Sequence, residues 1–456
     1  MRIKIRCIMV VTFSALLFLP LSIQAVQTLT LEESIAIALK NSFVINIAKE
    51  GAKGAEARKR EAMTGFLPKF STSYNYTRLN EDPSMKLPDL SYPFTEILSP
   101  SVIALVNGLE LPAGTKNNYT WSVEVRQPLF AGGGILANYQ ASKIAEDAAF
   151  IEESAKVQDV VQDVKISYYN ILRAERLRDT ARQAVEMLNA HRDVAQNFYR
   201  VGLIPKNDLL QAEVELANGK QAQVRAQNAV DLAKSSFNTI LKRELISPVE
   251  VVDILDYKPL SQSFQECLDI ARQHRPELKL STLKAEQAGK MVRAAQSDFF
   301  PSVGLVGQYG RFGDSPSVSG TEFKDMESWQ VMAVASWNFW EWGKTKFRVD
   351  AGRAIENQAI DQSKELNDQV ALEIKNAYLL LQEAESQIAV SQKVIDQAEE
   401  NFRISEARYK ERVARSTEVL DAQTLLTKAK YEYTNALANY NTFYVRLQRA
   451  MGVVNR

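Results

Sequence analysis

The chain has 456 residues, of which 55 are Lys or Arg and 55 are Asp or Glu, so its formal net charge is zero. It contains neither a basic stripe nor basic residues interleaved with aromatic ones, and this composition excludes nucleic acid as an expected partner. The two cysteines, Cys7 and Cys267, lie far apart in the sequence.

The first 25 residues have the pattern of a secretory signal peptide. Arg2, Lys4 and Arg6 precede an apolar run from Ile8 to Leu21. Because the run is short and no stop-transfer charges follow it, we expect cleavage near residue 25 rather than an uncleaved anchor. No later segment approaches the ~20 apolar residues of a membrane-spanning helix, so any crossing of a membrane has to use strands.

Removal of the signal peptide takes Cys7 away and leaves Cys267 as the single cysteine. One cysteine cannot form an internal disulfide, so packing has to hold the secreted chain together. Cys267 lies on an apolar helical segment, and we expect it to be a small buried residue.

Residues 31–240 and 264–450 repeat one another in the order short helix, strand pair, very long helix, turn and helix. The two copies align at an offset of 264 − 31 = 233 at their starts, at 208 where Trp121 meets Trp329, and at 210 from residue 164 onward. A duplicated unit of this kind builds a pseudo-symmetric wall. We divide the chain into a signal peptide (1–25), a first repeat (26–246), a linker with a short strand (247–263) and a second repeat (264–456).

Each repeat contains a predicted pair of strands, at 69–78 and 119–128 in the first and at 302–312 and 328–340 in the second. Apolar and polar residues alternate strictly from Tyr119 to Arg126, and most apolar residues of each of the other three segments lie on one parity, which marks strands with one apolar face. Their lengths are close to the ~9–11 residues that cross a bilayer, and aromatic residues lie near their ends. The alternative is a soluble β-domain with an apolar inner face.

Four strands cannot close a membrane barrel, and an open sheet edge is not tolerated in lipid. Several chains therefore have to contribute strands to one barrel. Two chains would supply eight strands and leave an interior filled by side chains, whereas three would supply twelve and leave a lumen. The strand count thus favours a trimer.

A long helical hairpin is predicted after each strand pair, at 134–243 and 343–452. Neither Gly nor Pro occurs between Gly134 and Gly202, and an uninterrupted helix of ~67 residues would be ~100 Å long. The returning helices carry apolar residues every seven positions, and a second heptad position is mostly Ala or Gly, so neighbouring helices can approach closely. A solitary antiparallel coiled-coil hairpin is the alternative.

Three segments resemble TolC-like outer-membrane efflux proteins, also called outer membrane factors. They are Gln127-Pro-Leu-Phe-Ala-Gly-Gly, Phe198-Tyr-Arg-Val-Gly-Leu-Ile-Pro and Thr417-Glu-Val-Leu-Asp-Ala-Gln. The resemblance covers nearly the whole mature chain. It implies a mainly α fold with a β-barrel portion, in which a homotrimer forms a 12-strand barrel in the outer membrane of a Gram-negative bacterium, continued by a 12-helix periplasmic α-barrel.

The resemblance also implies the partners. These are two further copies of the chain, outer-membrane lipid, a periplasmic adaptor (membrane fusion) protein and an inner-membrane transporter of the RND, ABC or MFS class, which supplies the energy. No cofactor, no metal and no nucleic acid are implied. The exported substrate remains open among drugs, metals, other small molecules and polypeptides.

Two groups of site residues come from the resemblance by position. Glu418 and Asp421 match an acidic constriction at the inner end of the tunnel, and their spacing puts both carboxylates on one helical face. Three copies would form a ring that favours cations and raises some carboxylate pKa values by mutual repulsion. The alternative is a solvated helix start, where acidic residues favour the helix dipole. The adaptor would contact the first tip, at Val201, Gly202, Leu203 and Asp208.

Tyr409, Arg412 and Arg415 lie at the second tip. We expect them to hold neighbouring hairpins closed through hydrogen bonds and ion pairs; exposed basic residues without such a role are the alternative. Arg412 stands where the first tip has a glycine, which leaves the geometry of the second tip open.

Catalysis has no support in the sequence. The two histidines, His191 and His274, lie in different repeats, and no Ser/His/Asp grouping, phosphate-binding loop or metal-ligand spacing surrounds them. We therefore expect a passive outer-membrane channel-tunnel of a tripartite efflux or type I secretion system. The alternative from a different class is a soluble periplasmic coiled-coil adaptor or scaffold.

Overall fold

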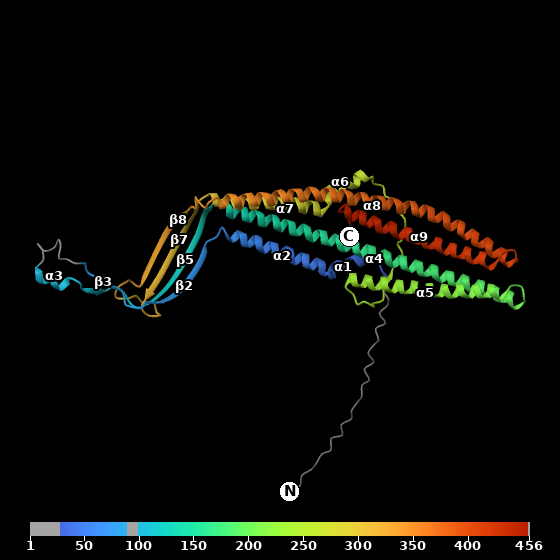
Figure 1. The fold of residues 1–456 in the computed structure, drawn as a ribbon, viewed down its shortest axis with the longest axis horizontal. Helices are drawn as coiled ribbons and strands as arrows, with labels where there is room; N and C mark the ends of the chain where they lie inside the picture. Colours follow the sequence, from blue (N-terminus) through green and yellow to red (C-terminus); the bar gives the residue numbers. More distant parts are fainter. Residues whose placement is uncertain (1–27, 89–98, 455–456) are drawn as a thin grey trace, which may run out of the picture.

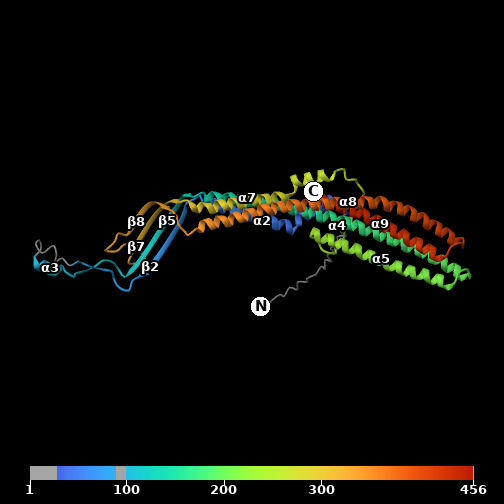
Figure 2. The same ribbon diagram turned by 45° about the horizontal axis from the view of Figure 1, so that its top comes forward.

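The computed structural model describes residues 28–88 and 99–454, so the predicted signal peptide at 1–25 lies outside the described residues. The molecule is long and narrow. A four-stranded sheet lies towards one end, and long helices run side by side from it to hairpin tips at the other end (Figures 1 and 2). Within the described ranges, no helix is both long enough and apolar enough to cross a membrane.

The two repeats have the same order of elements. The first contains α1 (Leu31–Asn41), α2 (Phe43–Thr64), β2 (Lys69–Arg78), β5 (Asn117–Ala131), α4 (Gly134–Arg200) and α5 (Lys206–Leu241). The second contains α6 (Phe264–His274), α7 (Pro276–Gln296), the 3-10 turn η2 (Ser297–Phe299), β7 (Ser302–Gly313), β8 (Glu327–Ser336), α8 (Lys344–Lys410) and α9 (Ser416–Ala450). The short helix expected at the start of each repeat is thus followed by a longer one, α2 or α7, that the sequence analysis did not separate.

Both repeats begin with the same helix cap. The Thr30 hydroxyl accepts the Glu33 N–H at 3.2 Å, and the Glu33 carboxylate accepts the Thr30 N–H at 3.0 Å. Ser263 and Glu266 make the corresponding pair of bonds at 3.3 and 2.7 Å. These reciprocal bonds satisfy backbone donors that the first turn of a helix leaves unpaired, which fixes where each repeat starts.

The sheet has the strand order β2-β5-β7-β8, and all neighbouring strands are antiparallel. β2 and β8 are therefore its two open edges. β8 ends at Ser336, four residues before the predicted end at residue 340. The reason is that Ser336 pairs with Ser302, the first residue of β7, so the residues after Ser336 have no strand to pair with.

The strand registers correct one part of the repeat alignment. Lys69 pairs with Arg126 in the first repeat, and Ser302 pairs with Ser336 in the second. Pro68 and Pro301, which directly precede the two first strands, are related by 233, so Lys69 corresponds to Ser302. With that offset the pairings relate the second strands by 336 − 126 = 210, which is also the offset between the helix-capping glycines Gly133 and Gly343. The offset of 208, which matched Trp121 with Trp329, was therefore wrong by two residues.

The loop between β2 and β5 is longer than the loop between β7 and β8. It contains β3 (Ser84–Lys86), which pairs with β4 (Glu110–Pro112), and the short helix α3 (Pro100–Val106). These elements project beyond the sheet, away from the long helices (Figure 1).

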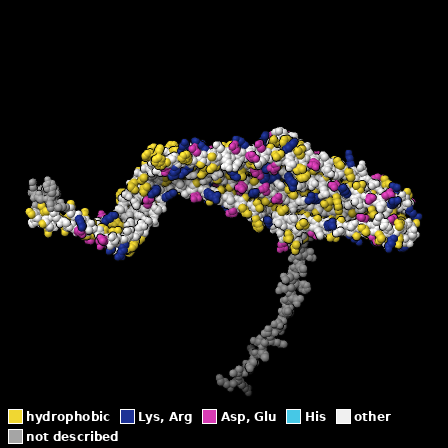
Figure 3. All heavy atoms as spheres, viewed as in Figure 1, with side chains coloured by type: hydrophobic (Ala, Val, Ile, Leu, Met, Phe, Trp, Pro, Cys, Tyr) yellow, Lys and Arg dark blue, Asp and Glu magenta, His cyan; other side chains and the backbone are white. Residues whose placement is uncertain are grey.

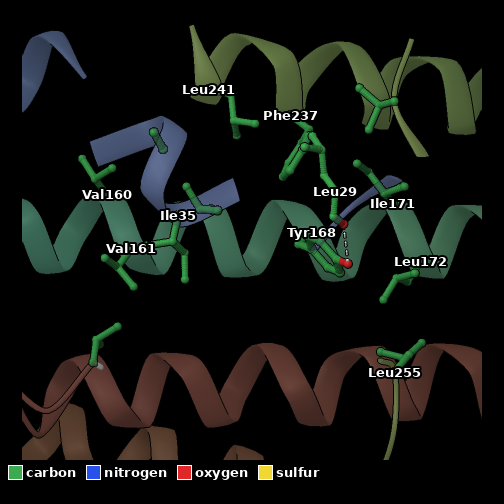
Figure 4. Close-up of a cluster of buried hydrophobic side chains, with 14 of the residues drawn as sticks. Leu29, Ile35, Val160, Val161, Tyr168, Ile171, Leu172, Phe237, Leu241 and Leu255 are labelled. Atoms are coloured by element: carbon green, nitrogen blue, oxygen red, sulfur yellow. Dashed lines mark hydrogen bonds between the residues drawn. The ribbon is translucent and has the colours of Figure 1, made fainter. Parts of the chain in front are cut away.

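The linker between the repeats forms a strand of only two residues. β6 (Glu250–Val251) runs parallel to β1 (Thr28–Leu29). The pairing stops there because Thr30, which follows β1, already caps α1. The hydroxyl of the buried Tyr168 on α4 donates to the Leu29 carbonyl oxygen at 3.1 Å (Figure 4) and shares its hydrogen with the Val252 carbonyl oxygen at 2.9 Å.

The main apolar core surrounds this junction in the middle of the helices. Phe237 and Leu241 of α5 face Val161, Tyr168 and other residues of α4 (Figure 4). Burial raises the pKa of Tyr168 to about 12, so the hydroxyl stays protonated and keeps donating. A second cluster around α6, α8 and α9 contains Cys267, which is completely buried as predicted.

An ion-pair network joins the two repeats near the C-terminus. The guanidinium of Arg449 on α9 lies 2.7 Å from the carboxylate of Asp159 on α4 and 2.5 Å from that of Glu277 on α7. The Arg449 side chain is only 11% exposed. Burial by itself would raise the pKa of Glu277, but its hydrogen bond and charge interaction with Arg449 outweigh this and lower it. The network therefore holds three long helices in place at a buried site.

Candidate functional site: the hairpin tips and the sheet

The first tip is a compact turn built around Gly202. Its φ of 77° lies in the left-handed region. The Gly202 N–H donates to the Tyr199 carbonyl at 2.9 Å and the Leu203 N–H donates to the Phe198 carbonyl at 2.8 Å. This pair of bonds is the Schellman motif, which ends a helix and satisfies its last carbonyl groups. After Pro205, α5 begins at Lys206.

The second tip has the same backbone geometry although it has no glycine. Arg412 adopts a φ of 64°, and its N–H donates to the Tyr409 carbonyl at 3.0 Å. The Val413 N–H donates to the Arg408 carbonyl at 2.8 Å, which completes the same motif. This geometry could not be derived from the local sequence. A non-glycine residue in this conformation is strained by roughly 1–2 kcal/mol, so Arg412 is held there by its surroundings.

The predicted adaptor-contacting residues fall in two places. Val201 and Leu203 project from the first tip with exposed fractions of 63% and 45%, beside Gly202. Asp208 lies in the first turn of α5, half-buried, where its charge acts on the hydroxyl of Tyr409. The structure thus separates an exposed apolar tip from a carboxylate that faces the second hairpin.

The predicted constriction residues, Glu418 and Asp421, are both exposed in the first turns of α9. The Glu418 carboxylate accepts the backbone N–H of Arg415 at 3.3 Å and lies 3.5 Å from the guanidinium of Arg408. Among the described residues, no hydrogen bond or ion pair involves the Asp421 side chain. Glu418 therefore stabilises the helix start, whereas Asp421 has a free carboxylate.

Tyr409 and Arg412 contact the first hairpin of the same chain. The Tyr409 ring, 3% exposed, lies 4.9 Å from the ring of His191 and 5.7 Å from that of Phe198, both on α4. The Arg412 guanidinium lies over the Phe198 ring at 5.9 Å. Within the single chain, ring packing makes these contacts; the hydrogen bonds and ion pairs expected to hold neighbouring hairpins closed stay a prediction. Arg415 is exposed and contacts Glu418 instead.

One hydrogen bond also crosses between the hairpins. Nε2 of His191 lies 2.8 Å from Oγ of Ser416, the first residue of α9. His191 is 8% exposed, and burial lowers its pKa against a smaller opposing effect of the Glu406 carboxylate. Burial raises the pKa of Tyr409, and the Asp208 carboxylate adds to this; its hydroxyl lies near Ser416 but has no hydrogen-bond partner in the described chain.

Sequence reasoning missed His191 as a member of this contact, and one signal could have found it. The buried residues Ala184, Leu188, His191 and Ala195 are spaced by four, three and four along α4. This spacing places the histidine in the apolar stripe that a long helix turns towards its neighbours.

The sheet at the other end of the molecule has two different faces. One face is apolar and carries Trp121, Tyr309 and Trp329, with the rings of Trp121 and Tyr309 6.1 Å apart. The other face is polar: the hydroxyls of Ser73 and Ser122 lie 2.9 Å apart, and the Gln330 amide donates to Gln308 at 2.7 Å. This division suits a sheet that has lipid on one side and water on the other.

Exposed aromatic side chains gather where β8 leads into α8 (Figure 3). They are Trp337, Phe339, Trp340, Trp342 and Phe347, which are between 58% and 84% exposed. No group of three His, Cys, Asp or Glu side chains that could hold a metal ion occurs in residues 28–88 and 99–454.

Comparison with known proteins agrees with these observations. Residues 35–241 and 267–453, one segment in each repeat, match the family described as outer membrane efflux protein. The outer membrane protein TolC of Escherichia coli is 22% identical over 394 residues, which cover 83% of this chain and 77% of TolC. The toluene efflux pump outer membrane protein TtgF of Pseudomonas putida is 23% identical over 428 residues, which cover 92% of this chain and 83% of TtgF.

A solved structure shows the same fold. The crystal structure of the CmeC outer membrane channel of Campylobacter jejuni superposes with a TM-score of 0.76. The match covers 93% of this chain and 85% of CmeC at 18% sequence identity. The duplicated arrangement of strand pair and helical hairpin is therefore a known architecture.

Proposed function

Because this chain belongs to the outer membrane efflux protein family, we propose that it is the channel-tunnel of a tripartite efflux or type I secretion system. It is an outer-membrane protein that reaches into the periplasm and serves efflux or secretion, and it is not an enzyme. In the proposed system, substrates pass through it passively from an inner-membrane transporter and a periplasmic adaptor to the exterior. Membership in this family removes the alternative of a soluble periplasmic scaffold.

The observation that carries this proposal is the direct continuation of the sheet into two helices of 67 residues each. At 1.5 Å per residue, each helix extends ~100 Å from the sheet. The sheet has four strands and two open edges, and a membrane barrel has to be closed. Three chains would provide twelve strands and a lumen, and their long helices would continue that lumen into the periplasm.

We place the constriction at the far end of this tunnel, at Glu418 and Asp421. Both carboxylates are exposed in a single chain and lie close to the second tip. A trimer would bring six of them together around one axis, and a ring of carboxylates attracts cations and repels anions. The partial neutralisation of Glu418 by Arg408 makes Asp421 the stronger contributor to this selectivity.

The exposed apolar residues Val201 and Leu203 support the first tip as the adaptor contact. Apolar side chains on a surface turn are suited to packing against a helical partner. The inner-membrane transporter supplies the energy in this scheme, so its own binding site selects the substrate.

Conductance of the purified protein in a planar lipid bilayer tests the proposal. We expect a small, cation-selective conductance. Replacing Glu418 and Asp421 by Ala should raise the conductance and weaken the cation preference. Glu365 and Asp368, which have the same spacing and exposure in the middle of α8, provide the matched control pair.

Two results would contradict the proposal. Unchanged conductance and selectivity in the Glu418→Ala, Asp421→Ala variant would contradict the assignment of the constriction to these residues. A folded, water-soluble protein that never inserts into the bilayer would contradict the proposed channel function.

A further inference from the structure

The open edges of the sheet, β2 and β8, belong to opposite ends of the strand order. Unpaired backbone groups at a sheet edge are not tolerated in lipid, so each edge needs a partner strand. We infer that β8 of one chain pairs antiparallel with β2 of the next chain in one specific register, which places Ser336 opposite Ser73. This inference rests on the proposed assembly of several chains into one barrel, and it specifies how their edges meet.

The register follows from the internal repeat. The joint between β5 and β7 links the second strand of one repeat to the first strand of the next repeat, as the joint between β8 and the neighbouring β2 would. The offset of 233 between Pro68 and Pro301 relates the first strands, and with the hydrogen-bonded registers it gives 210 for the second strands. Adding 210 to a residue of β5 gives its equivalent in β8, and subtracting 233 from a residue of β7 gives its equivalent in β2.

Three pairs of the internal joint show the result. Arg126 pairs with Val306, and the equivalent pair between two chains is Ser336 opposite Ser73. Val125 pairs with Gly307, and its equivalent is Ala335 opposite Tyr74. Ala131 pairs with Ser302, and its equivalent is Glu341 opposite Lys69. The joint between β8 of one chain and β2 of the next, here called the seam, would therefore extend beyond Ser336, where β8 ends in the single chain.

The side chains brought together in this register complement one another. Glu341 meets the opposite charge of Lys69, and Ala335 leaves room for the large ring of Tyr74. Trp340, equivalent to Phe130, meets Phe70, and these two side chains are 67% and 74% exposed in the single chain. Opposite charges and aromatic pairs across strands each stabilise a sheet by roughly 0.2–1 kcal/mol, so this register covers residues that otherwise stay exposed.

The seam cannot copy the internal joint at the corner where strands become helices. A Cβ atom on Gly132 would lie 2.2 Å from the Ser297 carbonyl oxygen, so the internal joint requires glycine there. The equivalent residue in the second repeat is Trp342, whose φ is 51° and whose side chain is 84% exposed. The equivalent of Ser297 is Thr64 at the end of α2. The helices at the seam therefore lie farther apart than α4 and α7, and Trp342 fills the added space.

Disulfide cross-linking in membranes tests the register. In a chain with Cys267→Ala, the pair Ser73→Cys and Ser336→Cys should oxidise rapidly into covalently linked chains that resist SDS and dissociate on reduction. The matched control is Ser73→Cys with Val334→Cys, which would lie opposite each other if the offset of 208 held. In the proposed register this control pair is diagonal, with the two residues roughly 7–8 Å apart and their Cβ atoms somewhat closer, which still exceeds disulfide geometry, so it should cross-link several-fold more slowly.

The outcomes separate this inference from the proposed function. Faster cross-linking of the control pair would overturn the register. Absence of cross-linking in both variants, while each still forms a conducting channel, would overturn the direct β8–β2 pairing and leave the channel function intact. If the protein without these substitutions showed no conductance, the result would instead contradict the proposed function.

Discussion

Acidification should loosen the contact between the two hairpins through His191. This residue of α4 is buried against α8 and α9. Its Nε2 lies within hydrogen-bond distance of the Ser416 hydroxyl, and its ring packs on Tyr409. Two carboxylates act electrostatically on this site. Glu406 acts on the imidazole of His191, and Asp208 acts on the hydroxyl of Tyr409. Neither forms a hydrogen bond with the imidazole, so a proton on His191 would be poorly compensated.

The sign and size of the effect follow from the lowered pKa of His191 in the folded protein. When the hairpins separate, the histidine becomes solvated and its pKa returns to about 6.5. Below this value the separated state takes up a proton that the packed state does not. The free energy of hairpin packing is therefore greatest above about pH 6.5. As the pH falls below this value, packing loses at most about 1.4 kcal/mol per pH unit, a tenfold change in the opening equilibrium, until the pH reaches the lowered pKa of His191 in the folded protein.

Hydrogen–deuterium exchange of residues 191–200 and 409–420 would measure this opening. After correction for the intrinsic pH dependence of exchange, protection should fall by up to about tenfold between about pH 7 and about pH 5.5. His191→Gln, which cannot titrate, should abolish this loss, whereas His274→Gln on the exposed end of α6 should preserve it. Equal acid sensitivity in the wild-type and His191→Gln proteins would refute the reasoning.

Three further substitutions test other parts of the structure. Tyr168→Phe should lower the free energy of unfolding by about 1–3 kcal/mol in chemical denaturation, because two buried carbonyl groups lose their donor. Arg449→Met should lower it by about 1–3 kcal/mol, because Asp159 and Glu277 lose a buried charged partner and keep only Lys156 and Arg275, whereas Arg446→Met on the exposed face of α9 should have little effect. Gly202→Val should abolish export while trimers persist on native gels, because a β-branched residue is strained in the left-handed region; Gly202→Asn should retain export.

Much of the fold could be predicted from the sequence because its signals are local. The absence of Gly and Pro after Gly134 predicts an uninterrupted helix, and α4 extends from Gly134 to Arg200. The alternation of apolar and polar residues predicts strands, and β2 spans Lys69–Arg78. Helix α2 was not separated from α1, because the break at Ser42 involves a cap that resembles an ordinary polar surface position.

The site was less predictable, since its contacts join residues that are distant in the sequence. Glu418 and Asp421 were found by resemblance, but the pairing of Glu418 with Arg408 depends on how the second tip folds back. The hydrogen bond from His191 to Ser416 crosses 225 positions of the chain. No local pattern specifies such a partner.

The sequence by itself determined the duplication, the kinds of element and the length of the long helix α4, because these depend on periodicity and on the positions of Gly and Pro. Only the tertiary structure decided how the elements meet. Backbone pairing, combined with the offset of 233 between Pro68 and Pro301, moved the correspondence of Trp121 from Trp329 to Val331. Contacts with Phe198 and the closing hydrogen bonds of the turn hold Arg412 in a conformation that its own chemistry disfavours.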